Sequence, residues 1–253
     1  MNKKISEIKA EFEATDKVML NELYAKYEKD ERTGVVNLIQ KYKKQEQKLC
    51  MERERIENMR IYERKYAHFS YICGIDEVGR GPLAGPVVAG AVILPKDCEI
   101  LYLNDSKKLS EKRREELYDE IMEKAIATGI GIVSPARIDE INILQATYEA
   151  MRIAIQQLET EPDLLLNDAV TIPGVTIDQV PIIKGDAKSV SIAAASIIAK
   201  VTRDRLMVQY DDVLLPGYGF VSNKGYGSAE HITALKTLGA TPIHRMSFIK
   251  NFV

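Results

Sequence analysis

Proline and glycine are distributed unevenly along this chain, and this limits what each part can fold into. All nine prolines and fourteen of the fifteen glycines follow Ser70, so residues 1–70 have almost no turn-forming chemistry. This first segment carries 16 Lys or Arg and 13 Asp or Glu, whereas the whole chain has a net charge of −2. We predict a small helical N-terminal extension over residues 1–70 and a second domain over residues 71–253.

The extension has apolar residues at helical spacing, but few of them. Ile5, Ile8 and Phe12 recur three and four residues apart, and Thr33-Gly34 interrupts the pattern. Residues 35–66 indicate one long charged helix with sparse apolar positions. Because this is too little apolar surface for a core of its own, we expect the helices to dock on the rest of the chain, on a partner or on nucleic acid.

After residue 70, short apolar runs alternate with stretches of helical periodicity. The pattern predicts strands over 71–75, 86–94, 130–133, 163–168 and 180–183, and helices over 110–125, 143–158, 189–207 and 228–238. Ser110 stands where it can cap the first of these helices. Alternation of this kind is typical of an α/β fold, in which helices pack on a central sheet.

Composition excludes several classes of protein. The balance of 35 basic against 37 acidic residues argues against a histone-like protein, which would bind nucleic acid through bulk positive charge. Three cysteines without a C-x-x-C pair favour neither a disulfide framework nor a thiolate zinc site. The N-terminus lacks the apolar run of a signal peptide, and no apolar stretch is long enough to span a membrane. We therefore expect a cytoplasmic protein.

Carboxylates follow apolar runs at three places where the local pattern does not require them. They are Asp76 and Glu77, Asp168, and Asp186. Acids at strand ends of an α/β fold project into the crevice where ligands bind. Four of them would repel one another unless a cation lay between them, and Mg²⁺ prefers oxygen ligands of this kind. Two such ions could activate a water and stabilise the leaving oxygen of a phosphodiester.

Other interpretations of the same acids remain open. A single Asp at a strand end is usually a turn former or a helix cap, which could account for Asp186. Asp76 and Glu77 reach one site only if their strand ends or bulges, since successive side chains on a strand point to opposite faces. The N-terminus of the helix that begins near Ser189 should favour the ionised form of Asp186.

A glycine-rich turn follows the first acid pair, with the sequence VGRGPLAGP over residues 78–86. Glycine permits positive φ and a close approach of the backbone to a ligand. The spacing matches neither a phosphate-binding P-loop nor a dinucleotide-binding loop. A tight hairpin with Arg80 in solvent is the alternative.

Four motifs, in this order and spacing, resemble ribonuclease HII, the type 2 ribonuclease H family. They are GIDEVGRGPLAGPVVAGAV, NDSKKLS, LLLNDAV and GDAKSVSIAAASIIAKVTRDR, and the resemblance extends from about Tyr71 to Phe248. It implies a ribonuclease H-like mixed sheet flanked by helices. The similar type 3 enzymes have Gly-Thr-Gly at the turn and a sheet-containing N-terminal domain, so Arg80 and the helical extension favour type 2.

The resemblance also implies an activity. The family hydrolyses the RNA strand of RNA–DNA hybrids and nicks duplex DNA on the 5′ side of an embedded ribonucleotide, leaving a 3′-hydroxyl and a 5′-phosphate. Its metal-binding catalytic acids fall on Asp76, Glu77, Asp168 and Asp186, with Mn²⁺ or Mg²⁺ as the cofactor. We expect a monomer whose substrates are RNA–DNA hybrids and ribonucleotide-containing duplex DNA.

The family's substrate-binding residues fall on further positions of this chain. The backbone of Gly79, Arg80 and Gly81 is expected to contact the ribose 2′-hydroxyl, the group that distinguishes RNA from DNA. Tyr226 is expected to stack on the following deoxyribose, where a 2′-hydroxyl would clash. Lys107 is expected to contact phosphate, although a solvated lysine is the usual outcome. The last candidate is Asn142, either a helix cap or a substrate contact.

Two other functions are compatible with parts of the sequence. A module that binds hybrids without cutting them would gain by losing acids that repel phosphate, and the acids are intact. A nucleotide-phosphate hydrolase would turn over a free nucleoside triphosphate and nick nothing. The three histidines (His68, His231 and His244) are far apart in the sequence and lack metal-ligand spacing, so we expect no catalytic role for them.

Overall fold

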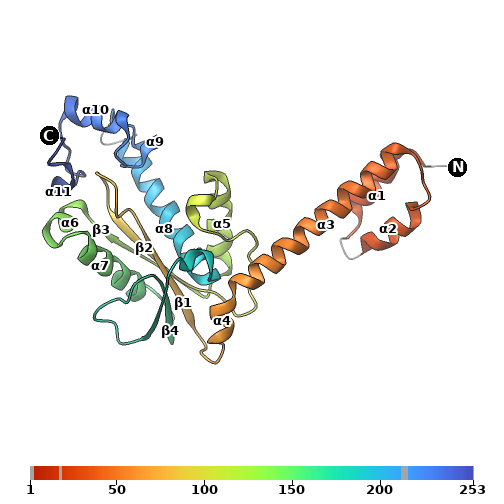
Figure 1. The fold of residues 1–253 in the computed structure, drawn as a ribbon, viewed down its shortest axis with the longest axis horizontal. Coiled ribbons are helices and arrows are strands. Elements are labelled where there is room, and N and C mark those ends of the chain that lie inside the picture. The colour runs from red at the N-terminus through yellow and green to blue at the C-terminus, as the bar shows by residue number, and fades with distance from the viewer. Residues whose placement is uncertain (1–2, 17–18, 212–215, 253) are drawn as a thin grey trace. The chain divides into compact units, whose positions relative to one another are not determined.

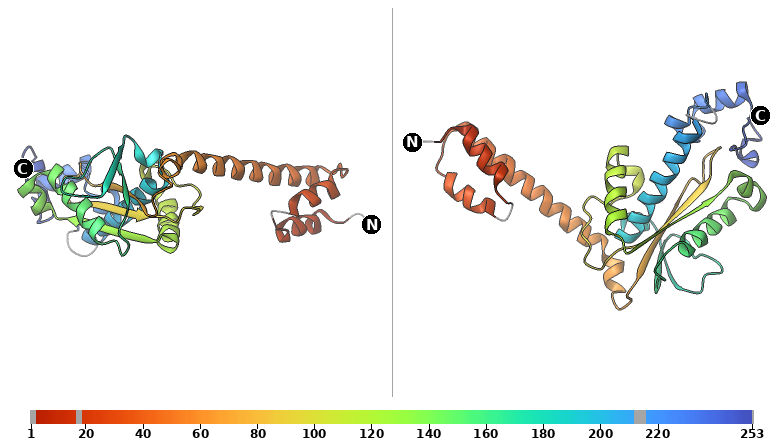
Figure 2. Two further views of the ribbon diagram at one scale, coloured as in Figure 1. Left: turned by 90° about the horizontal axis from the view of Figure 1, so that it is seen from below. Right: turned by 180° about the vertical axis from the view of Figure 1, so that it is seen from behind.

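The computed structural model describes residues 3–16, 19–211 and 216–252. The chain divides into two compact units, Met1–Arg55 and Ile56–Val253. The helices and strands of both are drawn in Figures 1 and 2. The predicted boundary at residue 70 stays a prediction.

The first unit contains helices α1 (Ile5–Ala14) and α2 (Leu20–Tyr27) and most of α3 (Thr33–Met59). The ring of Phe12 lies 5.9, 6.3 and 5.0 Å from the rings of Tyr24, Tyr27 and Tyr42, centroid to centroid. Aromatic side chains bury roughly 150–250 Å² each, so a few of them replace many aliphatic positions. The expectation that the extension lacks a core of its own is therefore wrong for this unit.

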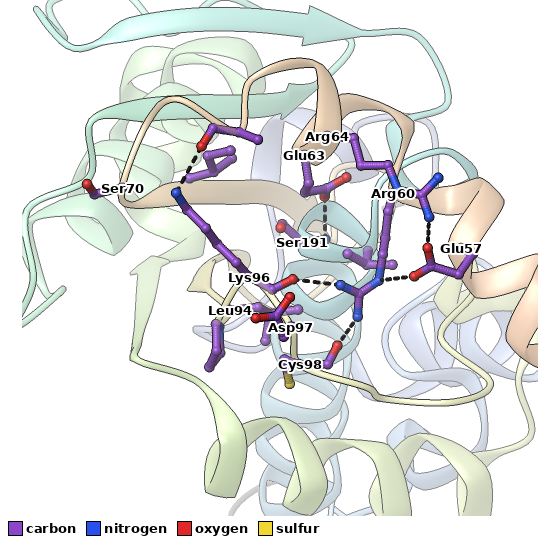
Figure 3. A pocket seen from close by; sticks show the side chains of 14 residues that line it. Glu57, Arg60, Glu63, Arg64, Ser70, Leu94, Lys96, Asp97, Cys98 and Ser191 are labelled. Atoms are coloured by element: carbon purple, nitrogen blue, oxygen red, sulfur yellow. Dashed lines mark hydrogen bonds and ion pairs between the residues drawn. The ribbon is translucent and has the colours of Figure 1, made fainter.

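The long helix predicted over residues 35–66 is broken in two. Helix α3 ends at Met59, and α4 (Ile61–Lys65) begins after Arg60. Arg60 donates to the carbonyl oxygen of Lys96 over 2.8 Å and also to that of Cys98, as Figure 3 shows. These contacts attach the break to the loop after β2, a long-range constraint that the helical pattern does not contain.

The second unit is built on one five-stranded sheet with the order β3-β2-β1-β4-β5. Strand β1 pairs antiparallel with β2 and parallel with β4, while β3 and β5 form the edges. The predicted mixed sheet with flanking helices is confirmed. The strands are β1 (Ile72–Val78), β2 (Val87–Ile93), β3 (Ala127–Val133), β4 (Leu164–Asp168) and β5 (Asp178–Ile182).

Helices cover both faces of this sheet (Figure 1). Helix α7 packs on β3 and β2, and α8 packs on β1 and β2 with α5 beside it. The helices of this unit after α4 are α5 (Glu111–Lys124), α6 (Pro135–Ile141), α7 (Ile143–Gln156), α8 (Val190–Gln209), α9 (Phe220–Asn223), α10 (Ala229–Leu238) and α11 (Met246–Ile249), with short 3₁₀ turns at η2 (Ser106–Lys108) and η3 (Gly185–Ala187).

Strand periodicity explains why each face is apolar. Cys73 and Ile75 belong to the cluster that packs under α7, whereas Val92, opposite Gly74, belongs to the cluster under α8. Ser110 accepts from the backbone N–H of Arg113 over 3.3 Å, so the predicted cap of α5 is confirmed. The core thus fixes β1 between two layers, and β1 carries the first acid pair.

Candidate active site

Strand β1 is longer than predicted, and it contains Asp76 and Glu77 rather than ending before them. Its antiparallel register with β2 continues through Asp76 opposite Gly90 and Glu77 opposite Ala89 to Val78. The predicted end of the strand at Ile75 is therefore wrong. The parallel pairing with β4 does stop there, at Ile75 opposite Asn167, so the two acids lie where β1 extends beyond β4.

Asp76 is the most buried of the four acids, with 6% of its surface exposed. Burial raises the pKa of its carboxyl well above the ordinary value, and the charge of Glu77 raises it further. A hydrogen bond from Ser196 of α8 opposes this shift in pKa. The hydroxyl of Ser196 is itself 2.9 Å from that of Ser106 in η2.

Glu77 is partly buried and has two cationic neighbours. Burial raises the pKa of its carboxyl, and the charge of Asp168 adds to the rise. Arg80 and Lys107 oppose it, and the Arg80 guanidinium lies 3.4 Å from a Glu77 carboxylate oxygen. Arg80 is exposed, as the hairpin alternative expected, and it also forms this ion pair with Glu77.

Asp168 ends β4 and receives a hydrogen bond of 2.7 Å from the backbone N–H of Gly185. This contact brings η3, and with it Asp186, next to the end of β4. Ala169 and Lys184, which flank the contact, have φ values of 56° and 57°. Positive φ in a residue with a Cβ costs energy and often occurs at functional sites.

Asp186 has a carboxylate neighbour that the sequence analysis missed. Burial raises the pKa of Asp186, and the charges of Asp105 and Asp168 raise it further. Asp105 also shares a hydrogen bond with Asp186, so the two side chains compete for a proton. The signal in the sequence is the acid that opens the DSKK motif, directly before Ser106 and the two lysines.

The N-terminus of α8 does not serve Asp186 as expected. Glu63 of α4 accepts hydrogen bonds from the hydroxyl of Ser189, over 2.5 Å, and from the backbone N–H of Ser191, over 3.0 Å. Figure 3 shows the second of these. Glu63 therefore lies at the N-terminus of α8, where Asp186 was expected. The pKa of Asp186 is raised rather than lowered, because burial and the charges of Asp105 and Asp168 act on it.

The four acids fit a divalent cation in their chemistry. All are hard oxygen donors, and a cation would offset the burial and repulsion that raise the pKa of three of them. Over residues 3–16, 19–211 and 216–252, however, no three His, Cys, Asp or Glu side chains are arranged so that they could hold a metal ion. The side chains would have to rotate toward one another, so the metal site stays a prediction.

Two buried arginines, Arg203 and Arg245, donate hydrogen bonds to carbonyl oxygens of the glycine turn. Arg245 donates to the carbonyl oxygens of Gly79, Arg80 and Gly85 over 2.5–3.0 Å. A trans peptide points its C=O and the next N–H in opposite directions. The N–H groups of Arg80 and Gly81 therefore face away from Arg245.

Arg203 holds the second half of the same turn. It donates to the carbonyl oxygens of Ala84, Pro86 and Lys224 over 2.9–3.0 Å. Its guanidinium carbon lies 5.9 Å from the ring centre of Tyr226, whose side chain is 41% exposed. The ring thus stands in solvent next to the turn.

The two glycines of the turn have different surroundings. Gly79 is buried with a φ of +90°, and a Cβ there would lie 2.7 Å from the carbonyl oxygen of Pro86. Gly81 is exposed, and the nearest atom to a Cβ there is Cε1 of Tyr226 at 4.0 Å. Gly79 is therefore required by packing, whereas Gly81 leaves open space toward Tyr226.

The two remaining candidates lie at different places. Lys107 is exposed in η2, near enough to Glu77 and Asp186 for its charge to oppose the rise in pKa of both. Asn142 has a φ of 68° and a ψ of 162°, and its side-chain oxygen accepts from the N–H groups of Leu144 and Gln145 over 3.0 and 3.2 Å. The cap interpretation of Asn142 is confirmed, and its contact with substrate stays a prediction.

His231 and His244 lie together, although the sequence separates them. Their Nε2 atoms are 3.0 Å apart in the interior. With Arg203 and Arg245 they form what we call the anchoring network (Arg203, His231, His244 and Arg245). Nothing in the linear pattern pairs these residues, because the chain must reverse direction after α10 to bring them together.

A cavity of ≈ 320 Å³ opens elsewhere, between α4, the loop after β2 and the start of α8 (Figure 3). It contains none of the predicted site residues. Its cations already have partners, since Arg60 binds main-chain carbonyls and Arg64 pairs with Glu57. The acids beside the glycine turn remain the stronger candidate site.

Two family profiles cover most of the chain. The Ribonuclease HII profile matches residues 73–251, and the Ribonuclease HII N-terminal domain profile matches residues 4–67. A ribonuclease HII from Lachnoclostridium phytofermentans is 75% identical over 205 residues, which are 81% of this chain and 80% of that protein. One from Clostridioides difficile is 58% identical over 204 residues, 80% of each chain.

A solved structure agrees with the fold. The crystal structure of the ribonuclease H2 from Pyrococcus horikoshii matches with a TM-score of 0.60 at 27% identity, covering 72% of this chain and 96% of that chain. Within the described residues, no helix combines the length and apolar character needed to cross a membrane. The chain belongs to the ribonuclease HII family of metal-dependent endoribonucleases.

Proposed function

We propose that this protein nicks duplex DNA on the 5′ side of an embedded ribonucleotide and cuts the RNA strand of RNA–DNA hybrids. The products carry a 3′-hydroxyl and a 5′-phosphate. The observation that carries the proposal is the electrostatic effect of Asp168 on the other three acids. Asp168 raises the pKa of Asp76, Glu77 and Asp186 alike.

The proposed catalytic residues are Asp76, Glu77, Asp168 and Asp186, which would hold Mn²⁺ or Mg²⁺. When bound, such ions lower the pKa of a water and stabilise the leaving oxygen of a phosphodiester. The exposed ammonium of Lys107 beside the acids would bind a phosphate oxygen of the substrate. Ser196 would keep the Asp76 carboxylate in one orientation.

Substrate selection is assigned to the turn and to Tyr226. The outward N–H groups of Arg80 and Gly81 would donate to the ribose 2′-hydroxyl. The exposed ring of Tyr226 would stack on the next sugar, where a further 2′-hydroxyl would clash. One element requires the hydroxyl and its neighbour rejects it, so the pair would select an RNA–DNA junction.

The remaining assignments rest on the chain as a whole. We propose that residues 71–253 carry the catalytic activity and that residues 1–70 contact the substrate or a partner. The protein would act as a monomer in the cytoplasm. Its three cysteines are free, which suits a reducing compartment.

A nicking assay tests the proposal. The protein is incubated with a labelled DNA duplex that contains one ribonucleotide, with Mn²⁺, with Mg²⁺ and with excess chelator. We expect one cut on the 5′ side of the ribonucleotide with either metal, none with chelator, and a 3′-hydroxyl that a DNA polymerase can extend. Tight binding of the duplex without cutting would instead support a hybrid-binding module, and hydrolysis of free nucleoside triphosphate without nicking a nucleotide hydrolase.

A further inference from the structure

The two imidazoles of the anchoring network are buried almost completely, with exposed fractions of 0% for His231 and 2% for His244. Aromatic rings enclose them. Phe220 meets His231 edge-on at 5.2 Å between ring centres, and Tyr218 lies 5.2 Å from His244. A buried pair of this kind is stable only if its polar atoms are satisfied and its members are not both charged.

The hydrogen bonds fix which ring nitrogen carries each proton. His231 Nδ1 lies 2.9 Å from the carbonyl oxygen of Tyr226, which can only accept, so Nδ1 carries the proton. At the other end, His244 Nδ1 accepts from the backbone N–H of Thr241 over 3.0 Å, so it is unprotonated. His244 must therefore donate from Nε2 to Nε2 of His231.

The result is a one-way chain of hydrogen bonds between two neutral rings. It runs from Thr241 through His244 and His231 to the carbonyl of Tyr226. Burial lowers the pKa of both histidines, that of His244 to about 4, which agrees with neutral rings. Every ring nitrogen has a partner, so the arrangement has a single satisfied form.

The series of hydrogen bonds ends at Tyr226, the residue whose ring lies next to the glycine turn. The loop before Tyr226 is bonded to the turn itself, since the backbone N–H of Leu83 donates to the carbonyl oxygen of Gly225 over 2.8 Å. The segment with His244 borders the other side, where Arg245 donates from its backbone N–H to Leu83 over 2.9 Å. The carbonyl oxygen of Tyr226 also accepts from the backbone N–H of Ser228 over 2.8 Å. Among the described residues, the imidazole pair adds the one side-chain bond to this carbonyl that comes from a buried group next to the turn.

We propose that His231 and His244 are positioning residues for substrate selection, which act by holding the backbone of Tyr226 so that its ring lies beside Gly81. The inference rests on the proposed function of Tyr226. Neither histidine touches substrate. Their effect is to keep the ring at the distance from the turn where it rejects a second 2′-hydroxyl.

Two substitutions at one position separate positioning from stability. In His231→Asn the side-chain nitrogen stands close to the place of Nδ1, so it still donates to Tyr226 but loses His244. In His231→Gln the side-chain amide lies close to the place of Nε2. The variant therefore keeps the hydrogen bond to His244 and loses the one to Tyr226. Each variant loses one buried hydrogen bond, so we expect similar falls in melting temperature.

The measured quantity is the ratio of kcat/KM for a single embedded ribonucleotide to kcat/KM for a continuous RNA strand on DNA. We expect His231→Gln to lower this ratio about three- to tenfold, at most about 1.4 kcal/mol, and His231→Asn to stay within about twofold of wild type. An equal fall in both variants, or no fall in His231→Gln, overturns the inference. If the unsubstituted protein nicks neither substrate, the proposed function fails first.

A second pair of variants applies if His231→Gln does not fold. At position 244 the expected effects of Asn and Gln are exchanged. The bond that matters at His231 is made by Nδ1, which Asn replaces, whereas the bond that matters at His244 is made by Nε2, which Gln replaces. His244→Gln still donates to Nε2 of His231, so it keeps the tautomer of His231 that donates to Tyr226 and should keep the ratio. His244→Asn leaves Nε2 of His231 without that donor, so the proton is no longer fixed on Nδ1 and the ratio should fall. The amide of His231→Asn has no tautomer to fix, so it keeps the ratio although it loses the same bond. The opposite order, or no difference between these two variants, contradicts a positioning role.

Discussion

Two neighbouring regions of the second unit differ in how their buried polar side chains are compensated. In one, like charges lie close together, and in the other, each buried group has a hydrogen-bond partner. In the acidic edge (Asp76, Glu77, Asp168 and Asp186), burial and the charge of neighbouring carboxylates raise the pKa of Asp76, Glu77 and Asp186. The anchoring network buries two arginines and two histidines, and each side chain has hydrogen-bond partners. The arginines donate to carbonyl oxygens, and the histidines bond each other, the carbonyl oxygen of Tyr226 and Thr241.

This difference indicates different roles for the two regions, ligand binding for the acidic edge and stabilisation of the fold for the anchoring network. Unmatched buried charge destabilises the folded state, and it persists where something else binds to it. Matched polar groups instead fix one geometry of the backbone around them. The acidic edge is accordingly expected to bind cations, and the anchoring network to keep the glycine turn and Tyr226 in register. Substitutions should therefore act oppositely in the two regions.

The largest effect is expected for Asp76→Asn. Cleavage should fall at least about a thousandfold, equivalent to about 4 kcal/mol in the barrier, because a negative oxygen donor for the metal is lost. Binding of the duplex should change little, since the groove contacts remain. In metal-free buffer the variant should also melt at a higher temperature, because a buried charge beside Glu77 is removed.

Single-turnover cleavage and thermal unfolding of Asp76→Asn measure the two parts separately. A matched substitution, Asp139→Asn, removes a carboxylate whose pKa is lowered by hydrogen bonds from Ser247 and Met246. That variant should lose stability and keep most of its activity. Normal turnover by Asp76→Asn would remove Asp76 from the mechanism, and a lower melting temperature would contradict the repulsion argument.

The next largest effect is expected from alanine in the turn. Gly79→Ala should lower the free energy of unfolding by about 3 kcal/mol, through positive φ and overlap with Pro86 and Arg203. Gly81→Ala should leave stability within about 0.5 kcal/mol. It should nevertheless slow cleavage at a ribonucleotide, because its methyl group lies where the sugar would approach.

Denaturant unfolding and nicking rates distinguish the two glycines. The comparison is sharpest when Gly81→Ala unfolds like wild type and cuts poorly. Equal stability of the two variants would mean that the turn is not held by the anchoring network. An unchanged nicking rate in Gly81→Ala would mean that the sugar does not approach this glycine.

Local pattern predicted the elements of the second unit well, because most of its strands and helices have a clear period. It misjudged β1, whose two acids look like an end of the apolar run. Pairing with the small residues Gly90 and Ala89 of β2 extends the strand through them. The length of β1 thus depends on its register with β2, which a pattern within β1 alone does not contain.

The residues of the candidate site also differ in whether a local pattern could identify them. The motif acids and glycines were identified because each carries a local signature. Asp105, His231 and Arg245 were missed, since their roles come from contacts across the fold, such as Arg245 reaching the carbonyl of Gly79. The core of the extension was missed as well, because Phe12 and the three tyrosines of helices α2 and α3 gather only once those helices pack together.

The smallest expected effect is a dependence of stability on pH. Unfolded histidine has a pKa near 6.5, and burial, with a smaller electrostatic contribution from His231, lowers that of His244 to about 4 in the folded protein. Between these values the unfolded state binds more protons than the folded state, so the contribution is complete above pH 6.5 and is lost as the pH falls toward 4. It should amount to at most about 3 kcal/mol.

The acidic edge opposes this trend, since carboxyls with a raised pKa take up protons in the folded state and stabilise it as the pH falls. A difference measurement removes that contribution. The free energy of unfolding is measured from pH 7 to pH 4 for wild type and for His244→Gln, which cannot titrate. The wild type should lose stability relative to the variant across this range. A constant difference would mean that His244 is not a neutral, buried base, and the hydrogen-bond chain to Tyr226 would lose its direction.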